Sequence, residues 1–205
     1  MPEIEIPTSH HIDRSQIART TSSLRPSSLR HMLKEATSAD HARLDARLGA
    51  LNLQSAGGYR QFLEINAAAL VPLERALIHA GVRDWLPDWD RRARTGAILS
   101  DLAALGGKPL FLDVSPLRDR LAVLGALYVL EGSRLGAAYL LKTVARSDDP
   151  IVSANTRFLS HGAGQHFWAS FLAVLEQAEA DNPDDLILPA RRAFGLFAAA
   201  ATVLS

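Results

Sequence analysis

Apolar residues recur along much of this chain at intervals of three and four, which is the spacing of one face of an α-helix. The first stripe begins at Leu29 and ends at Leu48, with Leu33, Ala36 and Leu44 between them. Comparable stripes lie within residues 59–80, 91–105, 166–180 and 189–203. Each of these segments is therefore predicted to be an amphipathic helix that buries one face.

Residues 118–146 form the longest apolar segment and are predicted to be a central, buried helix. Their apolar side chains occupy nearly every face of a helix rather than one stripe. No segment alternates between apolar and polar positions as a half-buried strand would. The pattern predicts an all-α fold, a single-domain helical bundle over residues 28–205. Residues 1–27 are rich in Ser, Thr, Pro and Arg without a sustained period, and we expect a disordered or loosely ordered tail there.

The composition narrows the function classes. Lys and Arg together number 22, as do Asp and Glu, and this balance gives no reason to expect a nucleic acid partner. The chain has no cysteine, so it has no disulfide and no thiolate site, which fits a reducing cytoplasm. No apolar run reaches the roughly 18 residues that span a bilayer. We also find no continuous apolar segment of the kind that a signal peptide carries near the N-terminus, so we expect a cytoplasmic protein without a membrane partner.

His41 is the first candidate for chemistry, because it shares the apolar face of the first predicted helix. Thr37, His41 and Leu44 follow one another at spacings of four and three, which places them on one side. One interpretation is a core histidine that a neighbour satisfies by a hydrogen bond. The other is a neutral imidazole that ligates haem iron, because a lone histidine suits haem while a zinc site needs more ligands.

A second candidate is the line of small residues in the central helix. Tyr128, Gly132 and Gly136 recur every four residues, and Ser133 adds a hydroxyl beside them. A glycine within a helix costs roughly 0.5–1 kcal/mol relative to alanine, so two on one face call for an explanation. Either another helix packs closely against them, or a flat ligand lies on the backbone.

The chain has only three lysines, Lys34, Lys108 and Lys142. Lys34 lies seven residues before His41 and so on the same face, and Lys142 lies near the end of the helix that carries the glycines. Most lysines are solvated surface cations. The alternative is that Lys34 and Lys142 are a pair of point charges that hold anionic groups at the mouth of a pocket.

Two stretches of sequence resemble the bacterial-type, biliverdin-producing haem oxygenase family. The stretch LKEATSADH, from Leu33 to His41, is similar to the family's proximal helix. The stretch YVLEGSRLGAAYLLK, from Tyr128 to Lys142, is similar to its distal helix and keeps a specific EGSxLGAA run. The resemblance covers roughly residues 29–205. It implies a haem-oxygenase-like bundle in which haem lies between a proximal and a kinked distal helix.

The resemblance implies haem-binding roles for four residues. His41 would ligate the iron as the proximal ligand. Lys34, Tyr128 and Lys142 match positions that contact the haem propionates. These contacts would fix the rotation of the ring in its plane, and so decide which meso carbon is oxidised.

Catalytic roles are implied for four more residues. Gly132, Ser133 and Gly136 would form the distal wall over the haem face, and Arg94 matches an arginine of a distal water network. A wall without a strong acid would leave proton delivery to ordered water. The chain departs from some relatives at Leu70, where they have a polar distal residue.

The function that the resemblance implies is oxidative cleavage of haem to biliverdin, with release of CO and ferrous iron. Haem would be both substrate and cofactor, and O2 the oxidant. No NAD or flavin motif is present, so electrons would come from an external donor, a ferredoxin or a flavoprotein reductase. A bilin acceptor such as a bacteriophytochrome is a candidate partner. The alternatives are a haem-binding protein of the same fold without catalysis, and a helical interaction module whose glycines pack against a partner.

Overall fold

The computed structural model describes residues 28–204, so the tail expected at residues 1–27 lies outside the described part of the chain. Within that part the chain is helical and has no strand, which confirms the predicted all-α class. The elements in chain order are α1 (Leu29–Gly49), α2 (Ala56–His79), the 3-10 helix η2 (Val82–Asp84), α3 (Trp89–Arg92), α4 (Thr95–Ala104), α5 (Arg120–Val144), α6 (Pro150–Ser153), α7 (Arg157–Ser160), α8 (Phe167–Leu175) and α9 (Asp184–Val203).

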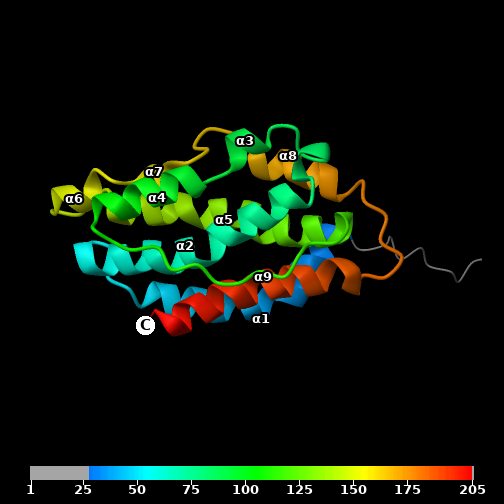
Figure 1. Ribbon diagram of the computed structural model, residues 1–205, viewed down its shortest axis with the longest axis horizontal. Coiled ribbons are helices and arrows are strands. Elements are labelled where there is room, and N and C mark those ends of the chain that lie inside the picture. The colour runs from blue at the N-terminus through cyan, green and yellow to red at the C-terminus, as the bar shows by residue number, and fades with distance from the viewer. Residues whose placement is uncertain (1–27, 205) are drawn as a thin grey trace, which may run out of the picture.

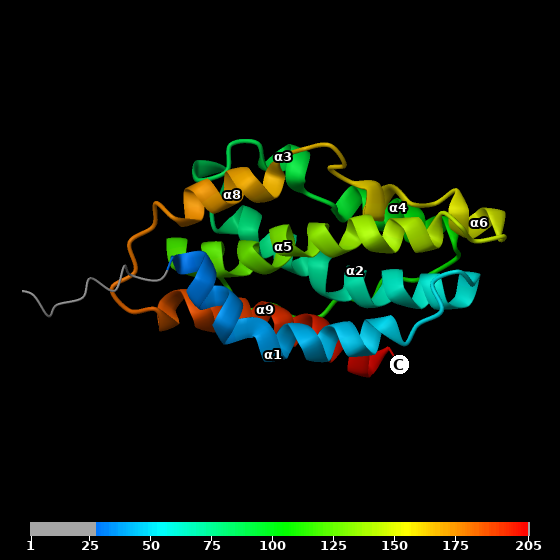
Figure 2. The same ribbon diagram turned by 180° about the vertical axis from the view of Figure 1, so that it is seen from behind.

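The helices form an elongated bundle with three layers (Figures 1 and 2). Helices α1 and α9 lie side by side along one long edge, α2 and α5 occupy the middle, and α3, α4, α7 and α8 cover the other edge. A long extended connection between α4 and α5 runs along the bundle. Its Leu112 N–H donates to the carbonyl of Ala68 on α2, at 3.0 Å, which holds the connection against the middle layer.

Helix α5 is central because its apolar residues meet neighbours on several sides, including α2, α7, α8 and α9. Its closest approach is at Gly125, where a Cβ would lie 2.4 Å from the carbonyl oxygen of Leu186 on α9. A glycine is needed there because any larger residue would push the two backbones apart. Helices α5 and α9 are each long and apolar enough to cross a membrane, and in the bundle they pack against each other.

The segment predicted as one helix over residues 91–105 is divided into α3 and α4. The carboxylate of Glu74 on α2 accepts hydrogen bonds from the N–H groups of Arg94 and Thr95, at 2.8 and 3.0 Å. It also accepts one from the Thr95 hydroxyl, at 2.7 Å. These bonds satisfy amides that a new helix leaves free, and a negative charge favours a helix N-terminus. The chain therefore ends α3 and starts α4 at this point.

Helix α9 starts at Asp184, earlier than the predicted residues 189–203, and Asp184 and Asp185 place two negative charges in its first turn. Helix α5 runs without interruption from Arg120 to Val144. The bend expected at its glycines stays a prediction.

Candidate active site

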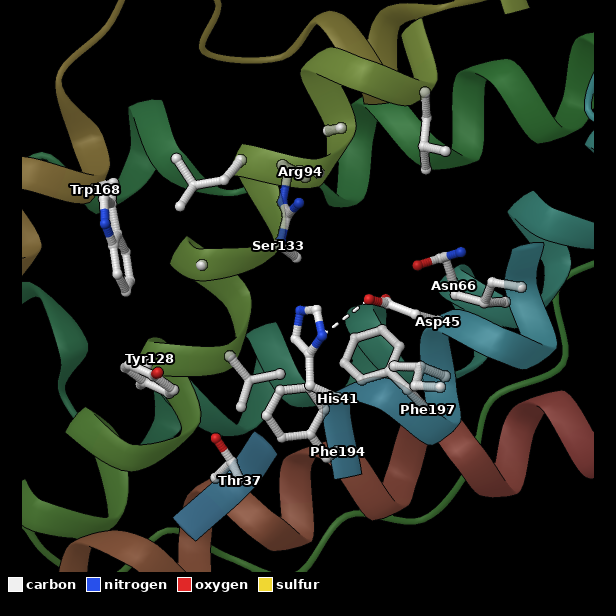
Figure 3. A pocket seen from close by; sticks show the side chains of 18 of the residues that line it. Thr37, His41, Asp45, Asn66, Arg94, Tyr128, Ser133, Trp168, Phe194 and Phe197 are labelled. Atoms are coloured by element: carbon white, nitrogen blue, oxygen red, sulfur yellow. Dashed lines mark ion pairs between the residues drawn. The ribbon is translucent and has the colours of Figure 1, made fainter. Parts of the chain in front are cut away.

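A cavity of about 590 Å3 lies between α1 and α5, within the roughly 300–1,000 Å3 that small-molecule sites enclose. Side chains of α2, α7, α8 and α9 close its other sides (Figure 3). The residues predicted for chemistry that line it come from three elements or their ends. They are Lys34, His41, Arg94, Tyr128, Gly132, Ser133 and Gly136.

His41 projects from α1 into the cavity, toward Ser133 on the opposite wall (Figure 3). Its side chain is 60% exposed, so it is not a core histidine although it shares a helix face with buried Thr37. The ring contacts Phe194 of α9 edge-on, with 5.7 Å between centroids. Its Nδ1 lies 2.9 Å from Oδ2 of Asp45, one turn further along α1. Nδ1 is therefore engaged, and Nε2 is the nitrogen left to act as a ligand.

The opposite wall is poor in side chains. A Cβ at Gly136 would meet nothing within 4 Å, and one at Gly132 would meet only the Trp168 ring, at 3.6 Å. Close helix packing, which explains Gly125, therefore does not explain Gly136 within the described part of the chain. The Ser133 hydroxyl donates to the carbonyl of Leu130, at 2.7 Å, so its proton is directed to its own helix. This wall leaves room for a ligand to approach the backbone of α5.

Arg94 contributes a buried cation to the same cavity. Its Nη2 donates to the carbonyl of Leu130, at 2.9 Å, and its guanidinium lies over the ring of Phe158. Burial and, secondly, the nearby Arg134 lower the pKa of Arg94 to about 10, which leaves it charged at neutral pH. Its Nε is buried without a hydrogen-bond partner among the described protein groups. Such a donor is usually satisfied by water or a ligand.

Lys34, which is exposed, and Tyr128 also line the cavity, whereas Lys142 is exposed on the later part of α5 and is not among the residues that line the cavity. Tyr128 is half-buried against Trp168, with 5.7 Å between ring centroids, and burial raises the pKa of its hydroxyl. Leu70 is buried in the core. The structure thus brings seven of the eight predicted site residues together and leaves Lys142 apart.

Sequence reasoning missed a buried ion cluster directly behind the small-residue wall. Glu131 accepts hydrogen bonds from Arg92 Nη1, at 3.1 Å, and from Arg134 Nε, at 3.0 Å. Arg92 also donates to the carbonyl of Phe167, at 2.9 Å, and stacks on that ring. Glu131 and Arg134 flank Gly132 and Ser133 in the sequence. The ion cluster therefore holds in place the turn of α5 whose Gly132 and Ser133 line the cavity. The signal was a single carboxylate, Glu131, in a long helix whose other charged residues are all basic.

An all-helical bundle with an imidazole on one wall of a cavity and a side-chain-poor helix on another defines a class of protein with room for a ligand between two helices. Comparison with known proteins agrees with this class. The sequence profile described as Heme oxygenase matches residues 86–202, more than half of the chain. The chain therefore belongs to the heme oxygenase family, of the bacterial type.

One curated relative is similar in sequence over part of the chain, and one solved structure shows the same fold. Heme oxygenase PigA of Pseudomonas aeruginosa is 35% identical over 103 residues, which are 48% of this chain and 52% of that protein. The match thus spans about half the length of this curated relative. The NO- and CO-bound heme oxygenase from Neisseria meningitidis has the same fold, with a TM-score of 0.72 and 24% identity over 87% of this chain and 92% of that one.

The residues present fit the haem that the family implies. The open space at Gly136 is a cradle that a side chain would fill, and Gly136 on α5 and His41 on α1 line the same cavity. Arg94 lines the same cavity, and its Nε is a buried donor without a hydrogen-bond partner among the described protein groups. Metal sites with three or more His, Asp or Glu are absent from residues 28–204, whereas haem needs only one protein ligand.

Proposed function

We propose that this chain is a haem oxygenase that cleaves haem to biliverdin, with release of CO and ferrous iron, using O2 and external electrons. The observation that carries the proposal is the pairing of His41 with the open backbone at Gly136 across one cavity. The chain that carries His41 and Gly136 belongs to the heme oxygenase family. Haem, when bound, would supply the iron that activates dioxygen and the ring carbon that is oxidised.

His41 is proposed as the proximal ligand through Nε2. Its Nδ1 is oriented by Asp45, and a carboxylate partner on the second ring nitrogen fixes the tautomer and raises ligand basicity. Phe194 packs edge-on against the imidazole and restricts its rotation. A neutral imidazole would also donate less electron density to a bound iron than a thiolate ligand would.

The distal wall is proposed to favour attack on the ring by withholding a strong acid. Asp45 is the only carboxylate among the described residues that line the cavity, and it lies beside His41 on α1. On the opposite side, Gly132, Ser133 and Gly136 offer no acid, and the Arg94 guanidinium keeps its proton at neutral pH. Arg94 Nε would instead hold an ordered water, which can carry a proton within the cavity.

Electrons are proposed to come from a separate protein, a ferredoxin or a flavoprotein reductase, in the cytoplasm. A bilin acceptor such as a bacteriophytochrome remains a candidate partner for the product. The propionate contacts predicted for Lys34 and Tyr128 are supported by their place in the lining of the cavity. The contact predicted for Lys142 has no such support.

The test is a turnover experiment with the reconstituted protein. Haemin is added to the full chain, followed by ascorbate, or by ferredoxin with its reductase, in air. We expect the Soret band to bleach and chromatography to identify a biliverdin, with CO in equal amount. A stable haem complex that gives neither product would support the alternative, a haem-binding protein of the same fold without catalysis.

A further inference from the structure

Asp101 of α4 is a buried carboxylate that the proposed chemistry of the cavity does not use. Its side chain is fully buried, and Oδ1 has no hydrogen-bond partner within residues 28–204. Oδ2 accepts a hydrogen bond from the backbone N–H of Phe158, the second residue of α7, at 2.8 Å. Burial raises the pKa of Asp101, because the charged form loses its water. A buried charge with one unpaired oxygen is costly, so the contact with Phe158 calls for an explanation.

Phe158 is held from α4 at two points, its amide and its ring. Arg94 directly precedes α4 and Asp101 lies seven residues further on, which places both on one side of the helix, two turns apart. The Asp101 carboxylate accepts the Phe158 N–H, and the Arg94 guanidinium lies over the Phe158 ring, 5.4 Å from its centroid. Phe158 and Arg94 both line the cavity. A displacement of the Phe158 backbone would therefore displace the surface on which the guanidinium rests.

The guanidinium of Arg94 has few other constraints in the described part of the chain. Its Nη2 donates to the carbonyl of Leu130, at 2.9 Å, and its Nε has no partner. The hydrogen bond from Arg94 to Glu74 comes from the backbone amide, so it fixes the start of the side chain and not its end. The carbonyl of Leu130 and the ring of Phe158 are thus the two contacts that orient the guanidinium.

Helix α7 depends on such outside contacts because it is a single turn, Arg157–Ser160. One turn contains few hydrogen bonds of its own and leaves its first amides free. The Tyr59 hydroxyl donates to the carbonyl of Asn155, at 2.9 Å, and so fixes the chain just before α7. Asp101 then takes up the amide of Phe158. The position of α7 against α4 is therefore set by a few polar contacts.

We propose that Asp101 is a positioning residue for Arg94, acting through the amide and the ring of Phe158. Its consequence for turnover rests on the proposed function, in which Arg94 holds a water in the cavity. The competing explanation is that Asp101 only stabilises the bundle through the exposed Arg157, whose Nη1 lies 3.9 Å from Oδ1. The two explanations differ because loss of that ion pair would leave the Arg94 guanidinium in place.

The test is the Nε–H signal of Arg94 in proton–nitrogen NMR spectra of the full-length, haem-free protein. Arg94→Lys identifies the signal, and Phe158→Leu gives its position without the aromatic ring. We expect Asp101→Ala to move the signal most of the way to its position in Phe158→Leu. Asp101→Asn, which keeps an oxygen for the Phe158 N–H, should stay near the wild type. Ser147→Ala controls for lost stability, because it removes a buried hydrogen bond to Gln54 outside α4 and α7.

Turnover gives a second readout in the haemin-loaded protein. Asp101→Ala should form bilin roughly tenfold more slowly than wild type, because a small misplacement of a positioned group lowers the rate. Its dissociation constant for haemin should stay close to the wild-type value, since Asp101 does not line the cavity. Asp101→Leu, which fills similar space without an acceptor, takes the place of Asp101→Ala if the alanine variant does not fold.

Two results would overturn the positioning role. One is an Arg94 signal in Asp101→Ala at its wild-type position. The other is an equal shift in Arg157→Gln, which would assign the effect to the ion pair. Failure of the proposed function appears differently, as wild-type protein that binds haemin and forms no bilin. The NMR comparison uses no haem, so it still decides whether Asp101 positions Arg94.

Discussion

The imidazole of His41 and the carboxylate of Asp45 lie on adjacent turns of α1, with 2.9 Å between Nδ1 and Oδ2. The spacing of four residues places both on one helix face, and both line the cavity. The pair leaves one ring nitrogen for a ligand and assigns the other to the carboxylate. Substitution of Asp45 therefore tests directly whether this carboxylate acts on the imidazole.

Asp45→Ala should weaken binding of haemin about tenfold or more, because metal sites lose 10–100-fold when the partner of a ligating histidine is removed. The iron–histidine stretching frequency of the ferrous complex, measured by resonance Raman spectroscopy, should fall as the imidazole becomes less basic. Glu35→Ala, an exposed acidic residue of α1 that pairs with His31, is the control. An unchanged frequency in Asp45→Ala would show that this carboxylate does not act on the ligand.

Gly136→Leu should block the cavity without unfolding the protein. A Cβ there meets open space, and replacing a helical glycine removes a cost of roughly 0.5–1 kcal/mol. We expect an unchanged or higher melting temperature together with loss of haemin binding, measured by calorimetry and titration. Gly195→Leu is the matched control, because Gly195 also has open space around it but lies on α9 and outside the cavity lining. Normal haemin affinity in Gly136→Leu would contradict the distal assignment.

Glu131→Gln should destabilise the fold strongly. It would leave Arg92 and Arg134 without the carboxylate between them, and removing one partner of a buried ion pair costs about 3–5 kcal/mol. Urea denaturation measures the free energy of unfolding. Asp90→Asn removes the partner of Arg83 at an exposed pair and should change the free energy of unfolding far less, because water already solvates both charges. Similar costs in the two variants would mean that the cluster does not hold α5 in place.

Stability should decline on mild acidification because of His161. Burial and, secondly, Arg134 lower the pKa of His161 in the folded protein. The unfolded chain, where histidine titrates near about 6.5, then binds the proton more readily, so the free energy of unfolding falls as the pH drops below that value. His161→Gln should lose less stability than wild type between pH 7 and pH 5 in urea denaturation. His79→Gln, at the exposed end of α2, controls for the loss of a histidine, and equal slopes in His161→Gln and wild type would contradict the prediction.

The helices that carry the site could be predicted from the sequence because their signal is local. The spacing of the stripe from Leu29 to Leu48 and the long apolar segment of α5 can both be recognised from neighbouring residues in the sequence alone. The break between α3 and α4 could not be predicted this way. It depends on the Glu74 carboxylate, which lies about twenty residues earlier in the chain and reaches Arg94 only in the folded bundle.

The site itself was predicted in part for the same reason. Spacing placed His41 on a helix face and Gly132 and Gly136 on another, and the structure brings the two faces together. Spacing does not reveal which end of a helix opens on a cavity. Lys142 was therefore expected at the cavity, whereas Arg30, one turn before Lys34, lines it and Lys142 does not. The contact between the Asp45 carboxylate and the His41 imidazole was likewise found only in the structure.

The most direct measurement of the central claim is the binding of haemin to His41→Ala with and without added imidazole. The account predicts that the variant folds, loses the histidine-ligated Soret spectrum, and regains it when free imidazole enters the space left beside Asp45. The same spectrum and affinity in His41→Ala and wild type, before imidazole is added, would contradict the claim that this histidine holds the iron opposite Gly136.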